Sequence, residues 1–248
     1  MSLESDPTAY ETEAFAENQT WKKRVCKRPG LWDSTTRATQ DRINGMIPEP
    51  VHKVVTATIR QVTQGIMTGS GWVSSRPLSF GTLQEREGAV RDRMKVYSRT
   101  ASVEGGVAGA GGLVLAAADL PALMTIKIKL LFEICALYGH DNRDPAERLF
   151  MLRIFQLAFS SARHRPRALE ALENALPGTP QAEAQENFDW QHFQLEYRDY
   201  LDLVKLAQLL PLIGAPVGAV ANWNLTRHLA RTAIQAYRLR WFKEHPPS

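Results

Sequence analysis

Apolar residues recur every three or four positions along most of this 248-residue chain, a spacing that predicts α-helices. The segment from about residue 82 to 103 is a clear example. Val90, Met94 and Tyr97 share one face there, and charged residues fill the rest. No segment shows the strict alternation that is typical of a half-buried strand. The pattern therefore predicts an all-α fold.

Two long stretches without any charge interrupt this amphipathic pattern, at residues 105–118 and 206–226. Small residues recur one helical turn apart in both stretches, and this spacing lets two helix backbones approach closely. The glycines at this spacing are Gly105, Gly109, Gly214 and Gly218. We therefore expect the two Gly/Ala-rich segments to pack against each other at the centre of one multi-helix bundle.

Aspartate and proline mark where two of the central helices begin. Asp119, followed by Leu-Pro, predicts an N-cap and a tight corner before an apolar helix that ends near Tyr138. Asp144, followed by Pro-Ala-Glu, predicts a second helix to about Ala162, with Glu147 closing a capping box. Further helices are predicted at 10–25, 34–46, 51–67, 82–103, 168–176, 190–210 and from the second uncharged stretch to about residue 242. These elements make one domain over residues 10–243, with short tails at 1–9 and 244–248.

Composition changes this picture only slightly. The net charge is +4 and the isoelectric point is near 9.1, which permits an anionic partner without requiring one. Cys26 and Cys135 are far apart in the sequence, so we expect reduced thiols rather than a disulfide framework. The first residues lack a basic segment followed by an apolar one, so we expect a cytoplasmic protein.

The segments 105–125 and 206–226, which contain the two uncharged stretches, are each about 21 residues long, the length that crosses a bilayer. However, the segment around the first stretch contains Asp119 and Pro121, and the second contains two prolines and two asparagines, so burial in protein explains both equally well. Contact with an anionic membrane surface stays open through a basic stripe on the last helix. This stripe consists of Arg227, Arg231 and Arg238, and its alternative role is that of a solvated helix face.

Acidic residues and a histidine near helix ends are the weak candidates for chemistry. Glu104, Asp119, Glu133 and His140 could hold a metal or act as acid and base. Each also has a structural explanation, such as capping by Asp119 and pairing of Glu133 with Lys129 one turn away. No metalloprotease, serine-hydrolase or phosphate-loop motif is present, so we assign no catalytic residue, metal or cofactor. The basic residues are dispersed without a nucleic-acid-binding signature, which argues against nucleic acid as a partner.

The uncharged stretches resemble two sequence blocks of the EcsC protein family of bacteria. The first block is Gly-x-x-x-Gly-x-Gly-Gly, then Ala-Asp-Leu-Pro-Ala-Leu, Glu-Ile-Cys-Ala-Leu-Tyr-Gly-His-Asp and Glu-Arg-Leu-Phe. The second is Leu-Pro-Leu-Ile-Gly-Ala-x-x-Gly-Ala-x-x-Asn, and the likeness covers roughly residues 10–243. The family is named after a component encoded beside an ABC transporter, some members are labelled peptidases, and no catalytic residues carry over.

The resemblance and the basic surface together lead to two functional expectations. The first is a cytoplasmic accessory protein that works at or near the inner membrane, with a transporter or a protease system as partner. The alternative is a hydrolase, peptidase-like or metal-dependent, that uses carboxylates around Asp119 and Glu133.

Overall fold

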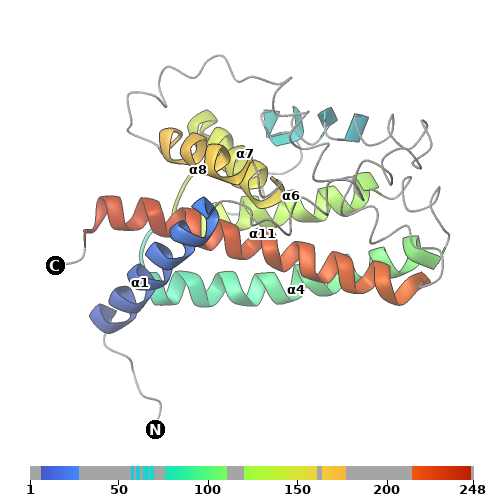
Figure 1. Cartoon of the computed structure of the whole chain (residues 1–248), viewed down its shortest axis with the longest axis horizontal. Helices are drawn as coiled ribbons and strands as arrows, with labels where there is room; N and C mark the ends of the chain where they lie inside the picture. Colours follow the sequence, from blue (N-terminus) through green and yellow to red (C-terminus); the bar gives the residue numbers. More distant parts are fainter. Residues whose placement is uncertain are drawn as a thin grey trace, which may run out of the picture.

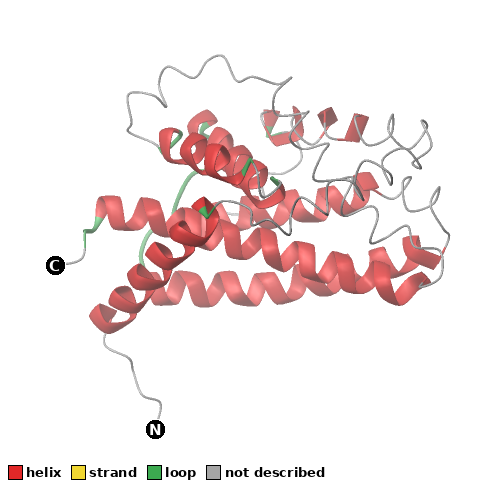
Figure 2. Ribbon diagram, viewed as in Figure 1, coloured by secondary structure: helices red, strands yellow, loops and turns green. Residues whose placement is uncertain are grey.

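Helices make up all the regular structure of the described residues in a computed structural model of the chain (Figures 1 and 2). The structure describes residues 7–27, 76–110, 120–160, 164–176 and 214–246, and positions 57–58, 60–61, 64–66 and 68–69. The helices are α1 (Pro7–Cys26), α4 (Leu83–Ala110), α6 (Leu120–Leu137), α7 (Pro145–Phe159), α8 (Arg165–Asn174) and α11 (Gly214–Glu244). The prediction of an all-α fold is confirmed. The predicted helices at 34–46 and 190–210 lie outside the described residues.

The two longest helices, α4 and α11, run antiparallel and side by side (Figure 1). Helix α1 crosses them at one end, α6 packs against both α4 and α11, and α7 packs against α11. The core lies between these layers and is densest along α6, where Leu130, Leu131, Phe132 and Ile134 are fully buried. The bundle is therefore organised around the α4–α11 pair.

The first uncharged stretch begins inside α4 rather than in a helix of its own. The predicted end near residue 103 is wrong, because α4 continues through Gly105 and Gly106 to Ala110. Helix α6 begins at Leu120, as predicted. The corner between these helices and the capping role of Asp119 fall on residues 111–119, which lie outside the described part of the chain.

Asp144 caps α7 as predicted, and its carboxylate accepts a hydrogen bond of 2.9 Å from the backbone N–H of Ala146. The prediction of a capping box at this helix is wrong, because the backbone N–H of Asp144 bonds to the Asp141 carbonyl and Glu147 turns into the core.

A capping box is present at the start of α4. The backbone N–H of Thr82 donates to Glu85, and that of Glu85 donates to the Thr82 hydroxyl.

Among the helices that the structure describes, none combines the length and the apolar character that a membrane span requires.

Gly105 of α4 lies directly against Gly218 of α11. A Cβ atom added to Gly105 would sit 2.6 Å from the Gly218 carbonyl oxygen, a distance that real Cβ atoms do not tolerate. The atom nearest to the added Cβ is the side-chain nitrogen of Asn222, whereas the Gly218 oxygen belongs to the backbone and can move only with its helix. Gly109 lies in α4 and Gly214 in α11, but the packing around these two positions is outside the described part of the structure.

This contact predicts that Gly105→Ala lowers the free energy of unfolding by about 1–3 kcal/mol, because the extra methyl group forces the helices apart. Gly88→Ala is a matched control on the same helix, since no atom lies within 4 Å of its added Cβ. It should stabilise the protein by roughly 0.5–1 kcal/mol through helix propensity alone. Urea unfolding of both variants measures the difference, and equal effects would contradict the close packing.

Candidate functional site

The acidic candidates from the sequence are not gathered into one cluster. Glu133 accepts a hydrogen bond of 2.7 Å from the Tyr97 hydroxyl and pairs with Arg93 at 3.3 Å, so its predicted pairing with Lys129 is wrong. Burial and the adjacent Glu133 carboxylate raise the pKa of Tyr97. Glu104 is half-buried near the end of α4, and Asp119 lies outside the described residues. In the part of the chain that the structure covers, no three acidic, histidine or cysteine side chains form a metal-binding group.

His140 does lie beside other reactive side chains. Its Nδ1 is 4.0 Å from Glu147, and the Cys135 sulfur is 4.0 Å from the same carboxylate. Burial, reinforced by Glu147, raises the pKa of the Cys135 thiol to about 12. Burial and the guanidinium groups of Arg240 and Arg86 lower the pKa of His140 to about 3. At neutral pH this group therefore holds a thiol and a neutral imidazole, not the thiolate that a cysteine hydrolase needs.

A cleft of about 390 Å³ opens beside His140. It is lined by the segment 78–81, by Arg86, by the turn 138–140 and by the last turns of α11. Gly139 closes the turn with φ at +89°, a conformation that favours glycine. The backbone N–H of Leu78 bonds to the Ala136 carbonyl at 2.9 Å and holds the segment against the end of α6.

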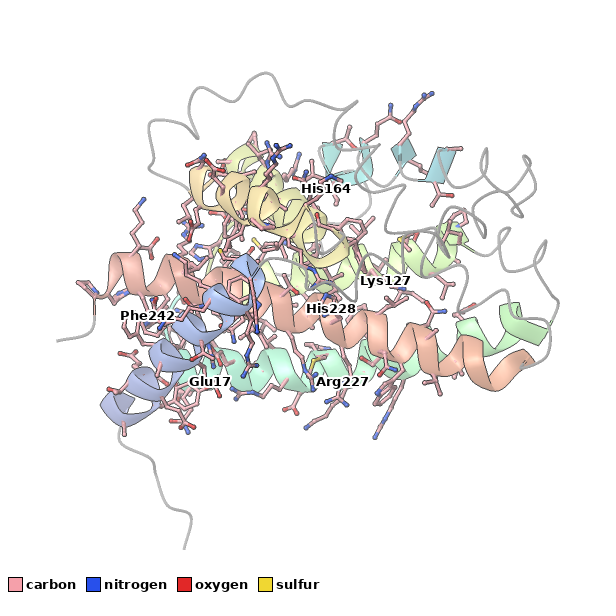
Figure 3. The ribbon with its side chains drawn as sticks, viewed as in Figure 1. Glu17, Lys127, His164, Arg227, His228 and Phe242 are labelled. Carbon is pink, nitrogen blue, oxygen red and sulfur yellow. The ribbon has the colours of Figure 1, made fainter. Side chains whose placement is uncertain are left out.

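Arg238 belongs to a buried ion network and not to the predicted basic stripe. Its guanidinium group donates to Glu87 at 2.7 and 2.8 Å and to Glu17 at 2.6 Å. Glu87 also accepts from Tyr10 and Arg91, so the network joins α1, α4 and α11. Figure 3 shows Glu17 on α1 where that helix crosses the bundle. Arg238 is therefore shielded from any external partner.

Lys127 is a fully buried cation without a carboxylate. Its ammonium group lies 3.0 Å from the Asn222 side-chain oxygen and 3.4 Å from the Leu123 carbonyl. Figure 3 shows it where α6 meets α11. Burial lowers the pKa of Lys127 from 10.5 to about 7. The sequence marked Lys127 only as one of four polar residues on an apolar helix. The one signal of its burial was its spacing from Lys129. Residues two apart on a helix point to nearly opposite sides, and Lys129 is exposed.

The outer face of α4 and α11 carries apolar and basic side chains together. Three valines are largely exposed on these two helices: Val96 at 52%, Val103 at 69% and Val220 at 59%. Arg99 lies between the first two on α4, and Arg227 and Arg231 follow Val220 on α11. Because seven residues make about two helical turns, Val96 and Val103 share one side of α4, as Val220 and Arg227 do on α11. We call these six residues the outer face.

The two parts of the outer face lie on neighbouring helices. Val103 precedes Gly105 by two residues, and Val220 follows Gly218 by two, so the Gly105–Gly218 contact brings these turns of the backbone together. Residues two apart on a helix point to nearly opposite sides, so each valine points away from that contact on its own helix. The Arg227 guanidinium lies over the Trp223 ring at 5.7 Å. Figure 3 shows Arg227 on the side of the bundle away from α7 and α8.

Comparison with known proteins gives consistent matches along nearly the whole chain. Residues 12–242 match the EcsC protein family. The chain is 37% identical to "Protein EcsC" of Bacillus subtilis (strain 168) over 225 residues, which cover 90% of this chain and 93% of that protein. It is 24% identical over 249 residues to "Uncharacterized protein YdbA" of the same organism, with 90% of each chain covered. No solved structure matches.

The burial of Lys127 predicts a pH-dependent stability. From about pH 7 to about pH 10 the unfolded chain binds a proton at this lysine that the folded protein has released. The free energy of unfolding should therefore rise with pH across this window. Lys127→Met should remove that rise and stabilise the protein at pH 7, on the order of a few kcal/mol.

Lys129→Met is the matched control, because Lys129 is exposed on the same helix. Urea unfolding at several pH values in this window compares the two variants with the wild type. If wild type and Lys127→Met gave parallel curves, the pKa of Lys127 would not be lowered in the folded protein.

Proposed function

The chain belongs to the EcsC protein family, and we propose that it is an accessory protein that attaches reversibly to the anionic cytoplasmic surface of the inner membrane. The observation that carries this proposal is the outer face, where exposed valines and arginines occur together. A transporter or a protease in the same membrane would be its working partner.

Apolar and cationic groups make complementary contributions at a lipid surface. Moving a valine side chain from water into the membrane interface contributes about 1.5 kcal/mol or more of binding free energy when the side chain is fully buried. Each arginine near an anionic leaflet adds about 1 kcal/mol. Three valines with Arg99, Arg227 and Arg231 therefore favour attachment that is reversible and sensitive to salt.

Two acidic residues of α4 lie near this face in the sequence. Asp92 is exposed and is neutralised by Lys95, from which it accepts a hydrogen bond of 2.9 Å. Half-buried Glu104 directly follows Val103 and offsets one of the three arginines. Trp223, partly exposed beneath Arg227, adds an aromatic ring of the kind that is enriched at membrane interfaces. The outer face therefore keeps a positive balance.

The hydrolase alternative gains no support from the described residues. It relied on carboxylates around Asp119 and Glu133, and the Glu133 side chain is already engaged by Tyr97 and Arg93. The Cys135 thiol is buried and protonated at neutral pH. Attachment to a surface requires neither group.

Flotation with lipid vesicles tests the proposal. Wild-type protein should float with vesicles that contain anionic lipid, and less so with neutral vesicles or at high salt. Arg227→Glu combined with Arg231→Glu should lower the bound fraction at least about tenfold, because each reversal replaces attraction with repulsion. Val103→Ser should lower it by a smaller factor of about three.

Arg167→Glu combined with Lys129→Glu is the matched control. It makes the same change in net charge at exposed positions of α8 and α6, and it should bind nearly as the wild type does. Equal loss in both double variants would mean that total charge matters and the outer face does not. Absence of wild-type flotation with anionic vesicles would refute direct membrane attachment.

A further inference from the structure

Arg86 differs from Arg238 and Arg240 on α11 in having no carboxylate partner. Arg238 is paired with Glu87 and Glu17, and Arg240 with Glu147 and Glu244. Arg86 is only 8% exposed, yet among the described residues no acidic side chain lies within ion-pair distance of it. A buried guanidinium group usually has an anionic partner, because removing its charge from water costs several kcal/mol.

Backbone carbonyl groups satisfy only part of the Arg86 side chain. Its Nε donates to the Gly81 carbonyl at 3.1 Å, and its Nη1 lies 3.3 Å from the carbonyls of Leu78 and Leu137. These bonds fix the guanidinium group in place, since they tie it to the segment before α4 and to the end of α6. They leave Nη2, with its two N–H groups, without an acceptor in the described structure.

This guanidinium group lines the cleft described above, and aromatic rings flank it. It lies over the Trp241 ring at 5.8 Å, and the Trp241 indole N–H is buried without an acceptor. Phe80 stands at the edge of the same cleft and is 80% exposed. The cleft thus combines a fixed cation, a free indole donor and two apolar rings.

The charges around the cleft leave Arg86 as the available cation. Glu244 also lines it, but its carboxylate accepts a hydrogen bond of 2.9 Å from Arg240. Glu147 behind the cleft bonds to Arg240 as well. The lowered pKa of His140 agrees with a positive field here, because Arg240 and Arg86 both disfavour its protonation.

We propose that the Arg86 cleft binds a small molecule that carries one anionic group beside a flat apolar body. A carboxylate or phosphate oxygen accepts hydrogen bonds from Arg86, where a guanidinium group is the preferred partner for either anion. The Trp241 ring already stacks on His245 with the ring centroids 4.5 Å apart, so the apolar body lies against Phe80 and the Trp241–His245 pair. A volume of about 390 Å³ falls within the range of small-molecule sites.

Benzoate, phenyl phosphate and the neutral isostere benzamide are the probes for purified full-length protein. Calorimetry should show saturable binding of at least one anion, about tenfold or more tighter than benzamide, because a charge-assisted hydrogen bond is lost with the amide. The comparison of benzoate with phenyl phosphate identifies the preferred anionic group. The bound anion should also raise the pKa of His140, which its imidazole NMR signals report.

Variants at both ends of the cleft locate the binding. Arg86→Gln should weaken it about tenfold or more, and Phe80→Ala, at an exposed position, should keep the fold and weaken binding about threefold. Lys243→Gln, exposed on the neighbouring turn of α11, is the control and should bind as the wild type does. If Arg86→Gln fails to fold, the affinity of Phe80→Ala and the ratio of the benzoate and benzamide affinities test the proposal instead.

Three results would overturn the proposal. The first is no saturable binding of either anion, and the second is equal affinity for benzoate and benzamide. The third is unchanged affinity in every folded cleft variant, which would place the bound anion elsewhere on this basic protein.

Discussion

The close approach of α4 and α11 at Gly105 and Gly218 is the constraint on which the described bundle depends. It brings two long backbones together at glycine positions, and the other helices pack against the pair. The same approach places Asn222, one turn after Gly218, where its amide nitrogen bonds to the Gly218 carbonyl and its oxygen meets Lys127. Toward the other end of the pair, Glu87 and Arg238 join the two helices by a buried ion pair.

Three buried cations in this structure are compensated in three different ways. Arg238 has two carboxylates, Arg86 has backbone carbonyls, and Lys127 has one amide oxygen and one carbonyl. The charge state of each group depends on how strongly its partners compensate the loss of water. The carboxylates keep Arg238 charged, whereas burial without a carboxylate brings Lys127 close to neutrality at physiological pH. The weakly compensated cations are the ones that remain sensitive to pH or to an added anion.

Sequence reasoning succeeded where a local rule decides the structure. The helical periodicity, the cap at Asp144 and the start of α6 depend on residues within one or two turns of one another. It failed where a distant partner competes with a local one. Glu147 leaves its capping position for Arg240, which is 93 residues away. Glu133 prefers Tyr97 to Lys129, and Arg238 meets Glu87 across 151 residues. These pairings depend on which side chains are buried together in the folded bundle, and the periodicity of a single helix does not reveal that.

The same distinction explains why the candidate sites were only partly visible in the sequence. Arg227 and Arg231 of the outer face follow from spacing on one helix, but the exposed valines beside them looked like ordinary helix residues. The Arg86 cleft involves the segment before α4, the turn after α6 and the end of α11, so only the fold assembles it. The outer face and the cleft occupy different lengths of α4 and α11. No residue is shared between them, so the two proposals can be tested independently.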